Sequence, residues 1–135
     1  MAYKIDEIDG IGPAYREKLT AAGIKNTDDL LDHCCTPKGR KEMGEKTGVS
    51  EKQLLEWSNM ADLMRVSGVG RQFAELLEAS GVDTIKELRH RNADNLATKM
   101  EEVNTEKKLS KASPSVSQIK DWIHQAKKPD PKIED

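Results

Sequence analysis

Two pairs of glycines stand where this chain could hold a phosphate group. Gly10 and Gly12 lie in "IDGIGPAYREKL", and Gly68 and Gly70 lie in "VSGVGRQFAELL", each pair followed by a helical pattern. Glycine permits positive φ and close backbone approach. The first N–H groups of a helix lack partners within it and attract anions. The spacing therefore predicts a turn between helices whose aliphatic residue, Ile11 or Val69, packs inward and whose N–H groups could bind phosphate.

The two glycine pairs differ in their charged neighbours. Acidic residues surround the first pair, and Pro13 lacks the backbone N–H that could donate to a phosphate there. Arg65 and Arg71 flank the second pair. We therefore expect phosphate to prefer the second pair, with weak, salt-dependent binding on the order of 10⁻⁴ to 10⁻⁶ M. The candidate nucleic-acid-binding residues are Arg65, Gly68, Gly70, Arg71, Gln72, Arg89, Arg91, Gly10 and Gly12.

An internal repeat relates the two glycine pairs. A shift of 58 positions carries Gly10 to Gly68, and it also pairs Tyr15 with Phe73 and Leu19 with Leu77. A shift of 65 positions then relates "SEKQLLEW", which starts at Ser50, to "SVSQIKDW", which starts at Ser115. So many matches are unlikely by chance and indicate duplicated helical units. The pattern predicts two pseudo-repeats, at about residues 3–58 and 61–126.

Helix start and stop signals predict an all-α protein of about ten short helices. Asn26, Ser50, Thr84 and Ser115 have the residue types that cap helix N-termini. The segment "WSNMADLM" contains no glycine or proline, so we expect an uninterrupted helix there rather than a hinge. Gly39 and Gly44 fall within a helical pattern, where alanine should be tolerated.

The duplicated units should pack as one compact domain. A chain of 135 residues favours a single core, which we expect Trp57, Trp122 and the leucine faces of the helices to build. We predict one helical domain over residues 1–126, followed by a flexible tail over residues 127–135 that is rich in lysine and proline.

Composition and residue spacing exclude several classes of protein. The apolar runs are far shorter than the roughly 20 residues that span a bilayer, so no membrane contact is expected. The net charge of −2 argues against a strongly basic nucleic-acid coat. The only cysteines, Cys34 and Cys35, are adjacent, which disfavours a disulfide and indicates a cytoplasmic protein. No metal-ligand or catalytic spacing is present, so no metal, no cofactor and no enzymatic activity are predicted.

The stretches "IDGIGPAYREKL" and "VSGVGRQFAELL" resemble helix-hairpin-helix motifs. The wider pattern, including "GVSEKQLLEWSNMADLMRVSGVG" and "VSQIKDWIHQAK", is similar to the bacterial family called domain of unknown function 4332. This resemblance implies a helix-hairpin-helix fold, with the four glycines at the two hairpins. Such proteins commonly hold nucleic-acid backbone at the hairpin, sometimes with a monovalent cation on the hairpin carbonyls.

Two functions stay open at this point. The first is a non-enzymatic module that contacts DNA or RNA backbone without sequence preference. The alternative is a protein–protein adaptor in which the hairpins are only structural. The near-neutral charge favours the adaptor, and the arginines at the second hairpin favour phosphate. Neither the partner nor the oligomeric state follows from the sequence.

Overall fold

The computed structural model describes residues 2–134, so Met1 and Asp135, which end the predicted ranges, lie outside the described residues. Helices make up the fold, which confirms the all-α prediction, and the described part of the chain contains no β-strand. A one-turn 3-10 helix precedes eight α-helices. These elements are η1 (Ile5–Glu7), α1 (Pro13–Ala21), α2 (Thr27–Cys34), α3 (Pro37–Thr47), α4 (Glu51–Leu63), α5 (Arg71–Ala79), α6 (Ile85–Leu88), α7 (Ala93–Lys107) and α8 (Val116–Ala126).

The helices begin where the sequence places capping residues. The side chain of Asn26 accepts a hydrogen bond from the backbone N–H of Asp29 at 2.8 Å, and Ser50 and Thr84 do the same for the N–H three residues on. Ser115 forms the complete capping box, because Gln118 also accepts from the Ser115 N–H. Each cap satisfies an N–H group that has no partner inside the helix.

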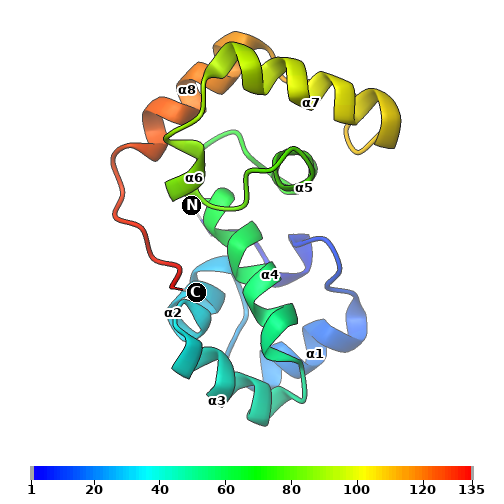
Figure 1. Cartoon of the computed structure of the whole chain (residues 1–135). Coiled ribbons are helices and arrows are strands. Elements are labelled where there is room, and N and C mark those ends of the chain that lie inside the picture. Colours follow the sequence, from blue (N-terminus) through cyan, green and yellow to red (C-terminus); the bar gives the residue numbers. More distant parts are fainter. Residues whose placement is uncertain (1, 135) are drawn as a thin grey trace.

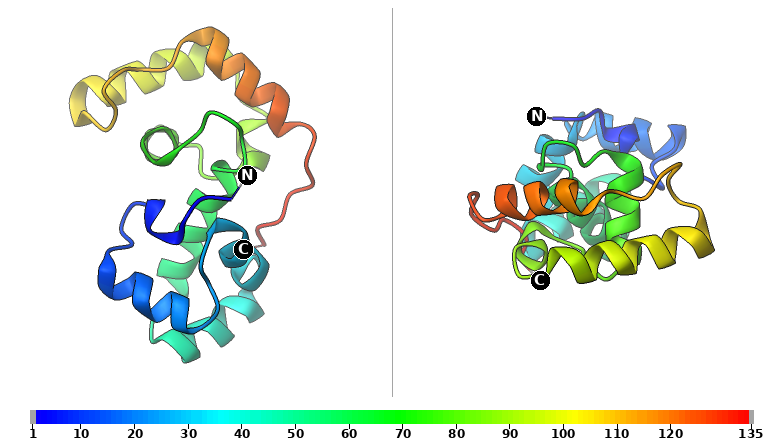
Figure 2. Two further views of the ribbon diagram at one scale, coloured as in Figure 1. Left: turned by 180° about the vertical axis from the view of Figure 1, so that it is seen from behind. Right: turned by 90° about the horizontal axis from the view of Figure 1, so that it is seen from above.

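Helix α4 connects the two ends of the molecule. Figure 1 shows it running from the end built by η1, α1, α2 and α3 to the end built by α5, α6, α7 and α8. It packs on α2 and α3 at one end and on α5 at the other, while α7 lies beside α8 (Figure 2). The helix is uninterrupted over residues 58–61, as predicted. The buried hydrophobic residues form one cluster, to which every α-helix contributes.

Gly39 corrects an expectation from the sequence. Helix α3 packs so closely on α2 that a Cβ at Gly39 would collide with the backbone carbonyl oxygen of His33. Gly44 is also restricted, because its Cβ would lie 3.0 Å from the carbonyl oxygen of Val49. The prediction that alanine is tolerated is therefore wrong at Gly39, where glycine permits close helix packing, and at Gly44 alanine requires the backbone at Val49 to shift.

We expect Gly39→Ala to lower the free energy of unfolding by about 1 kcal/mol, because overpacking costs more than the gain in helix propensity. Gly12→Ala is the matched control, since a Cβ there has no neighbour within 4 Å and φ is −89°. Urea unfolding followed by circular dichroism measures both. Equal stability of Gly39→Ala and wild type would contradict the packing of α3 on α2.

Residues 127–134 lie against the rest of the protein, although the sequence predicts a flexible tail (Figure 1). Arg89 donates to the carbonyl oxygen of Pro129 at 2.6 Å. At the other end, the buried Arg40 donates to the carbonyl oxygen of Glu134, also at 2.6 Å. Ile133 is half-buried against the core. Flexibility of this segment stays a prediction, but its described conformation spans the molecule from α6 to α3.

No helix within residues 2–134 combines the length and the apolar character that crossing a membrane requires.

Candidate functional site

The second glycine pair forms a tight turn between α4 and α5. Gly68 has φ +96°, which only glycine adopts readily, and Gly70 has φ −93° and ψ −165° as the N-cap of α5. The N–H of Val69 donates to the carbonyl oxygen of Val66 at 3.0 Å. Val69 is fully buried, as predicted. The turn thus has the positive φ that the glycine pattern predicts, at Gly68, whereas Gly70 has an extended backbone because the chain is entering the helix.

The first glycine pair has the same local geometry. Gly10 has φ +93°, and Gly12 caps α1 with φ −89° and ψ −173°. The N–H of Ile11 donates to the carbonyl oxygen of Ile8 at 3.1 Å. This turn joins the short η1, rather than an α-helix, to α1. The equivalence of the turns agrees with the repeat, whereas superposition of residues 3–58 on residues 61–126 stays a prediction.

A tryptophan lies beneath each turn. The indole Nε1 of Trp57 is 3.3 Å from the position of a Cβ on Gly10, and that of Trp122 is 3.1 Å from the equivalent position on Gly68. Both indoles are buried, and each contacts an aromatic ring on the helix that follows the turn above it. Trp57 contacts Tyr15 of α1, and Trp122 contacts Phe73 of α5. The sequence predicted both tryptophans as core residues, and the structure adds that they support the turns.

The arginines at the second turn already have acidic partners. Arg65 donates to the buried carboxylate of Asp62 at 2.9 Å. Arg71 forms an ion pair with Asp9 of the first turn at 3.2 Å, with both side chains about half exposed (49% and 45%). The structure thus places the Arg71 side chain between the two turns, and its charge is largely compensated.

The other candidate residues also have intramolecular partners. Arg89 donates to the carbonyl oxygens of Ala126 and Pro129. Arg91 lies 3.7 Å from the carboxylate of Glu87 and donates to the carbonyl oxygen of Gly81. The Oε1 of Gln72 accepts from the hydroxyl of Ser110 at 3.5 Å. The fold therefore does not bring Arg65, Arg71, Arg89 and Arg91 together as one free basic surface.

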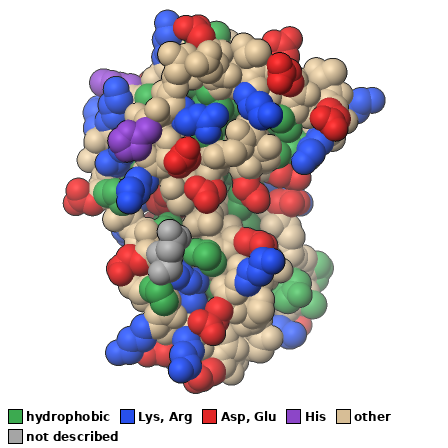
Figure 3. Space-filling view, in the orientation of Figure 1, with side chains coloured by type: hydrophobic (Ala, Val, Ile, Leu, Met, Phe, Trp, Pro, Cys, Tyr) green, Lys and Arg blue, Asp and Glu red, His purple; other side chains and the backbone are tan. Residues whose placement is uncertain are grey.

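Carboxylates gather instead between α4 and the α5 end of the molecule. Two cavities, of about 240 and 330 Å³, share Glu56 and Glu78 as lining residues, with Asp9 lining the first and Asp83 the second. Figure 3 shows acidic side chains in a row across the waist of the molecule. We call the two cavities together the acidic cleft. Neither cavity is lined by a lysine or an arginine within residues 2–134.

The electrostatics of the acidic cleft are unfavourable to its own charges. Partial burial raises the pKa of Glu78 above its usual range, and the carboxylates of Glu56, Asp83 and Asp9 raise this pKa further, against the opposing effect of Lys107. Partial burial also raises the pKa of the neighbouring Glu75, with Asp9 adding to the shift and Arg71 opposing it. The ionised cleft thus holds repulsion that a bound cation would relieve.

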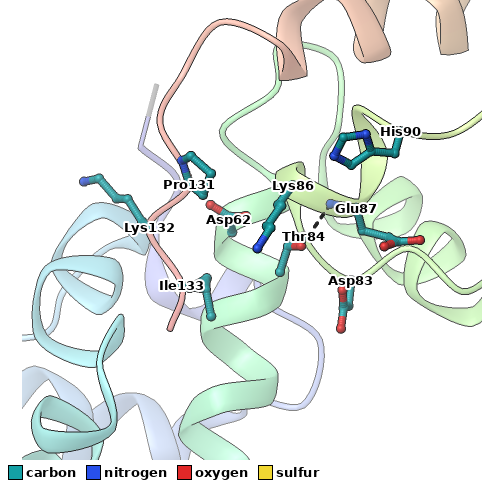
Figure 4. Close-up of a pocket in the computed structure, with 9 residues that line it drawn as sticks. All are labelled: Asp62, Asp83, Thr84, Lys86, Glu87, His90, Pro131, Lys132 and Ile133. Carbon is teal, nitrogen blue, oxygen red and sulfur yellow. Dashed lines mark hydrogen bonds between the residues drawn. The ribbon is translucent and has the colours of Figure 1, made fainter. Parts of the chain in front are cut away.

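A further cavity of about 280 Å³ lies between α4, the segment around α6 and the C-terminal segment (Figure 4). Its lining is mixed in charge, with Lys86, His90 and Lys132 set against Asp62, Asp83 and Glu87. Asp62 accepts the backbone N–H of Ile85 at 2.8 Å and so joins α4 to α6. Asp62 is buried, whereas the other charged side chains of this lining are exposed.

The cysteines and histidines form no ligand set. Within the described residues, no group of three histidine, cysteine or acidic side chains is arranged to hold a metal ion. Burial raises the pKa of the Cys34 thiol to about 11, although Arg40 opposes this shift. A thiol with that pKa stays protonated at neutral pH and is a poor nucleophile.

The sequence did not reveal the acidic cleft. Glu56 and Asn59 are three residues apart on α4, and Glu75 and Glu78 have the same spacing on α5, so each pair shares a helix face. This spacing signals a polar face on α4 and an acidic face on α5 but not their proximity. Only the packing of α5 on α4 brings the faces together.

Comparison with known proteins gives a family without an assigned activity. Residues 9–129 match the family described as a domain of unknown function (DUF4332). Comparisons with curated proteins and with solved structures found no significant match. Because the matched segment covers nearly the whole chain, this protein belongs to the DUF4332 family.

Proposed function

We propose that this protein is a non-enzymatic, cytoplasmic protein-interaction module whose two glycine turns serve packing. The observation that carries this proposal is the internal pairing of all four candidate arginines, two of them with Asp62 and Asp9. The buried tryptophans beneath Gly10 and Gly68 give the turns a structural role that needs no ligand. The net charge of −2 also offers no general attraction for a polyanion.

The interaction proposal is tested by affinity capture with the immobilised chain from a nuclease-treated lysate of the source cells. Each captured protein is then purified, and its binding to the chain is measured by isothermal titration calorimetry. We expect at least one purified protein to form a saturable binary complex. If no captured protein binds once it is purified and free of nucleic acid, the proposal is wrong.

Contact with nucleic-acid backbone is the second candidate function. Gly70 offers α5 no side-chain cap, so the N–H groups at the start of that helix remain available to a phosphate. The Arg71–Asp9 pair is about half exposed, and such pairs are weak enough to exchange partners. This candidate therefore requires Arg71 to leave Asp9 for a phosphate.

The Arg71–Asp9 pair allows a matched test of the second candidate. Asp9→Asn frees Arg71, whereas Asp6→Asn frees Arg16 from an equally exposed pair at the first turn. Under the interaction proposal, neither variant gains appreciable affinity for labelled duplex or single strands at physiological salt. Fluorescence anisotropy over a range of salt concentrations measures this. Salt-sensitive binding that increases several-fold in Asp9→Asn alone, and is lost in Arg71→Glu, would favour the nucleic-acid function instead.

A further inference from the structure

Two polar groups of α4 lack hydrogen-bond partners in the described structure. Trp57 is 1% exposed, and its indole N–H has no acceptor; the Oδ1 of Asn59 is also buried and has no donor. Native proteins leave few buried polar groups unpaired, and each one calls for a missing partner. Trp57 lines the first cavity of the acidic cleft and Asn59 lines the second. The cleft thus contains one unpaired donor and one unpaired acceptor.

The indole N–H of Trp57 is buried beneath Gly10, at the wall of the first cavity. Gly10 is exposed and lines this cavity together with Trp57. Among residues 2–134, and apart from Gly10 and its chain neighbours, the Nε1 of Trp57 is the one heavy atom within 4 Å of the point that a Cβ on Gly10 would occupy. This unpaired donor thus lies directly beneath the exposed Gly10, at the edge of the space that the cleft offers to a ligand.

The carboxylates of the cleft suit an extended cation. Glu56, Glu78 and Asp83 are distributed over two adjoining cavities, with Asp9, the partner of Arg71, at the edge of the first. These carboxylates do not form a metal-ligand group in the described chain. A basic peptide carries both required kinds of group, since its main-chain carbonyls accept hydrogen bonds and its lysine or arginine side chains donate them to carboxylates and amides. Complementary charge of this kind also favours fast and selective association.

We propose that the acidic cleft binds a basic segment of a partner protein, with lysine or arginine side chains against Glu56, Glu78 and the Oδ1 of Asn59, and a main-chain carbonyl against the indole N–H of Trp57. This inference rests on the proposed interaction function and assigns its site and the chemistry of its partner. The repulsion within the cleft is consistent with it, because a bound cation relieves that repulsion.

The first test uses a fluorescein-labelled octapeptide of alternating arginine and glycine, with a glutamate–glycine octapeptide as the probe control. We expect Glu56→Gln and Glu78→Gln each to weaken binding of the arginine peptide about fivefold, as removal of one partly exposed charge pair does. Glu101→Gln is the matched control, because Glu101 is an exposed acid on α7 away from the cleft. An equal loss in all three variants would mean general attraction to an acidic protein and would overturn the proposal.

Stability separates loss of binding from loss of folding. Glu78→Gln removes a carboxylate that repels Glu56, Asp83 and Asp9, so its melting temperature should rise while its affinity for the peptide falls. A variant that merely unfolds would lose both. A lower melting temperature in Glu78→Gln would contradict the repulsion on which the cleft argument depends.

The two tryptophans give a spectroscopic test within one sample. The protein has two tryptophans, and the indole N–H of each lies beneath a glycine turn. Of the two, Trp57 lines the acidic cleft and Trp122 does not. In ¹⁵N-labelled protein, the arginine peptide should shift the Trp57 indole resonance and leave that of Trp122 nearly unchanged. Trp57→Phe and Trp122→Phe assign the two signals. An unmoved Trp57 resonance at saturating peptide would overturn the proposal.

The purified partners captured by the chain distinguish failure of this site from failure of the proposed function. If a partner binds Glu56→Gln and Glu78→Gln as tightly as it binds wild type, the protein is an interaction module that uses another surface. If no purified partner binds and nucleic acid does, both the site and the function are wrong. Loss of partner binding in the two cleft variants but not in Glu101→Gln is the expected result.

Discussion

Asp62→Ala should lower the free energy of unfolding by about 3 kcal/mol, the effect of breaking a buried, hydrogen-bonded ion pair. Asp62 is 2% exposed; one carboxylate oxygen accepts the N–H of Ile85 at 2.8 Å and the other accepts Arg65 at 2.9 Å. Alanine would leave a buried N–H group and a largely buried guanidinium without their acceptor. The loss should also loosen α6 against α4, since the Asp62–Ile85 hydrogen bond joins them.

Asp121→Ala is the control for this prediction. Asp121 is an exposed acid on α8 that accepts a hydrogen bond from Gln125, so its removal should change stability by no more than about 0.5 kcal/mol. Urea unfolding monitored by circular dichroism gives both values. Similar midpoints for Asp62→Ala and Asp121→Ala would show that the carboxylate of Asp62 does not join the helices as described.

Gly68→Ala should destabilise the protein by about 2–3 kcal/mol, whereas Gly70→Ala should change stability by less than about 0.5 kcal/mol. At Gly68, φ is +96° and a Cβ would lie 3.1 Å from the indole Nε1 of Trp122, so alanine would suffer backbone strain and a side-chain collision. At Gly70, φ is −93° and a Cβ would have no neighbour within 4 Å. The small cost of alanine at an N-cap is offset there by reduced entropy of the unfolded chain.

Thermal and urea unfolding measure the difference in stability between the two variants. The variants are matched, because each replaces one glycine of the same turn. The near-ultraviolet circular dichroism of Gly68→Ala should also change, because the substitution displaces Trp122. Equal destabilisation by both substitutions would contradict the difference in φ. Equal tolerance of both would mean that the turn does not need positive φ at Gly68.

Local sequence determined most of the secondary structure of this protein. Asn26, Ser50, Thr84 and Ser115 cap the helices that they were expected to start. These features depend on the backbone and on side chains within a few residues, so a short window of sequence contains their cause. The burial of Ile11 and Val69 and the positive φ at Gly10 and Gly68 were predictable for the same reason.

Gly39, where the prediction failed, and Gly70, which the glycine pattern did not distinguish from Gly68, show the limit of local reasoning. Gly39 has an ordinary helical environment in sequence, and only the approach of α2 makes alanine collide with the carbonyl oxygen of His33. Gly70 follows the same motif as Gly68, but its extended backbone comes from its place as the first cap of α5. The sequence does not tell whether a glycine is needed for its positive φ or because a Cβ would collide with a neighbouring atom.

The sequence by itself determined the all-α class, the helix starts and the paired glycine turns, whereas the residues that could bind a phosphate stay a prediction. Arg65 and Arg91 pair with acids three and four residues away along the chain, but tertiary structure alone decided the other charge contacts. Arg71 meets Asp9 across 62 positions of sequence, and Glu56 meets Glu78 because α5 packs on α4. A charge acts on its neighbours in space, over a few ångströms, and in these two cases the neighbours come from different elements of the fold. The same residues that indicate a phosphate site in sequence thus become, in the folded protein, an internally paired turn beside an acidic cleft.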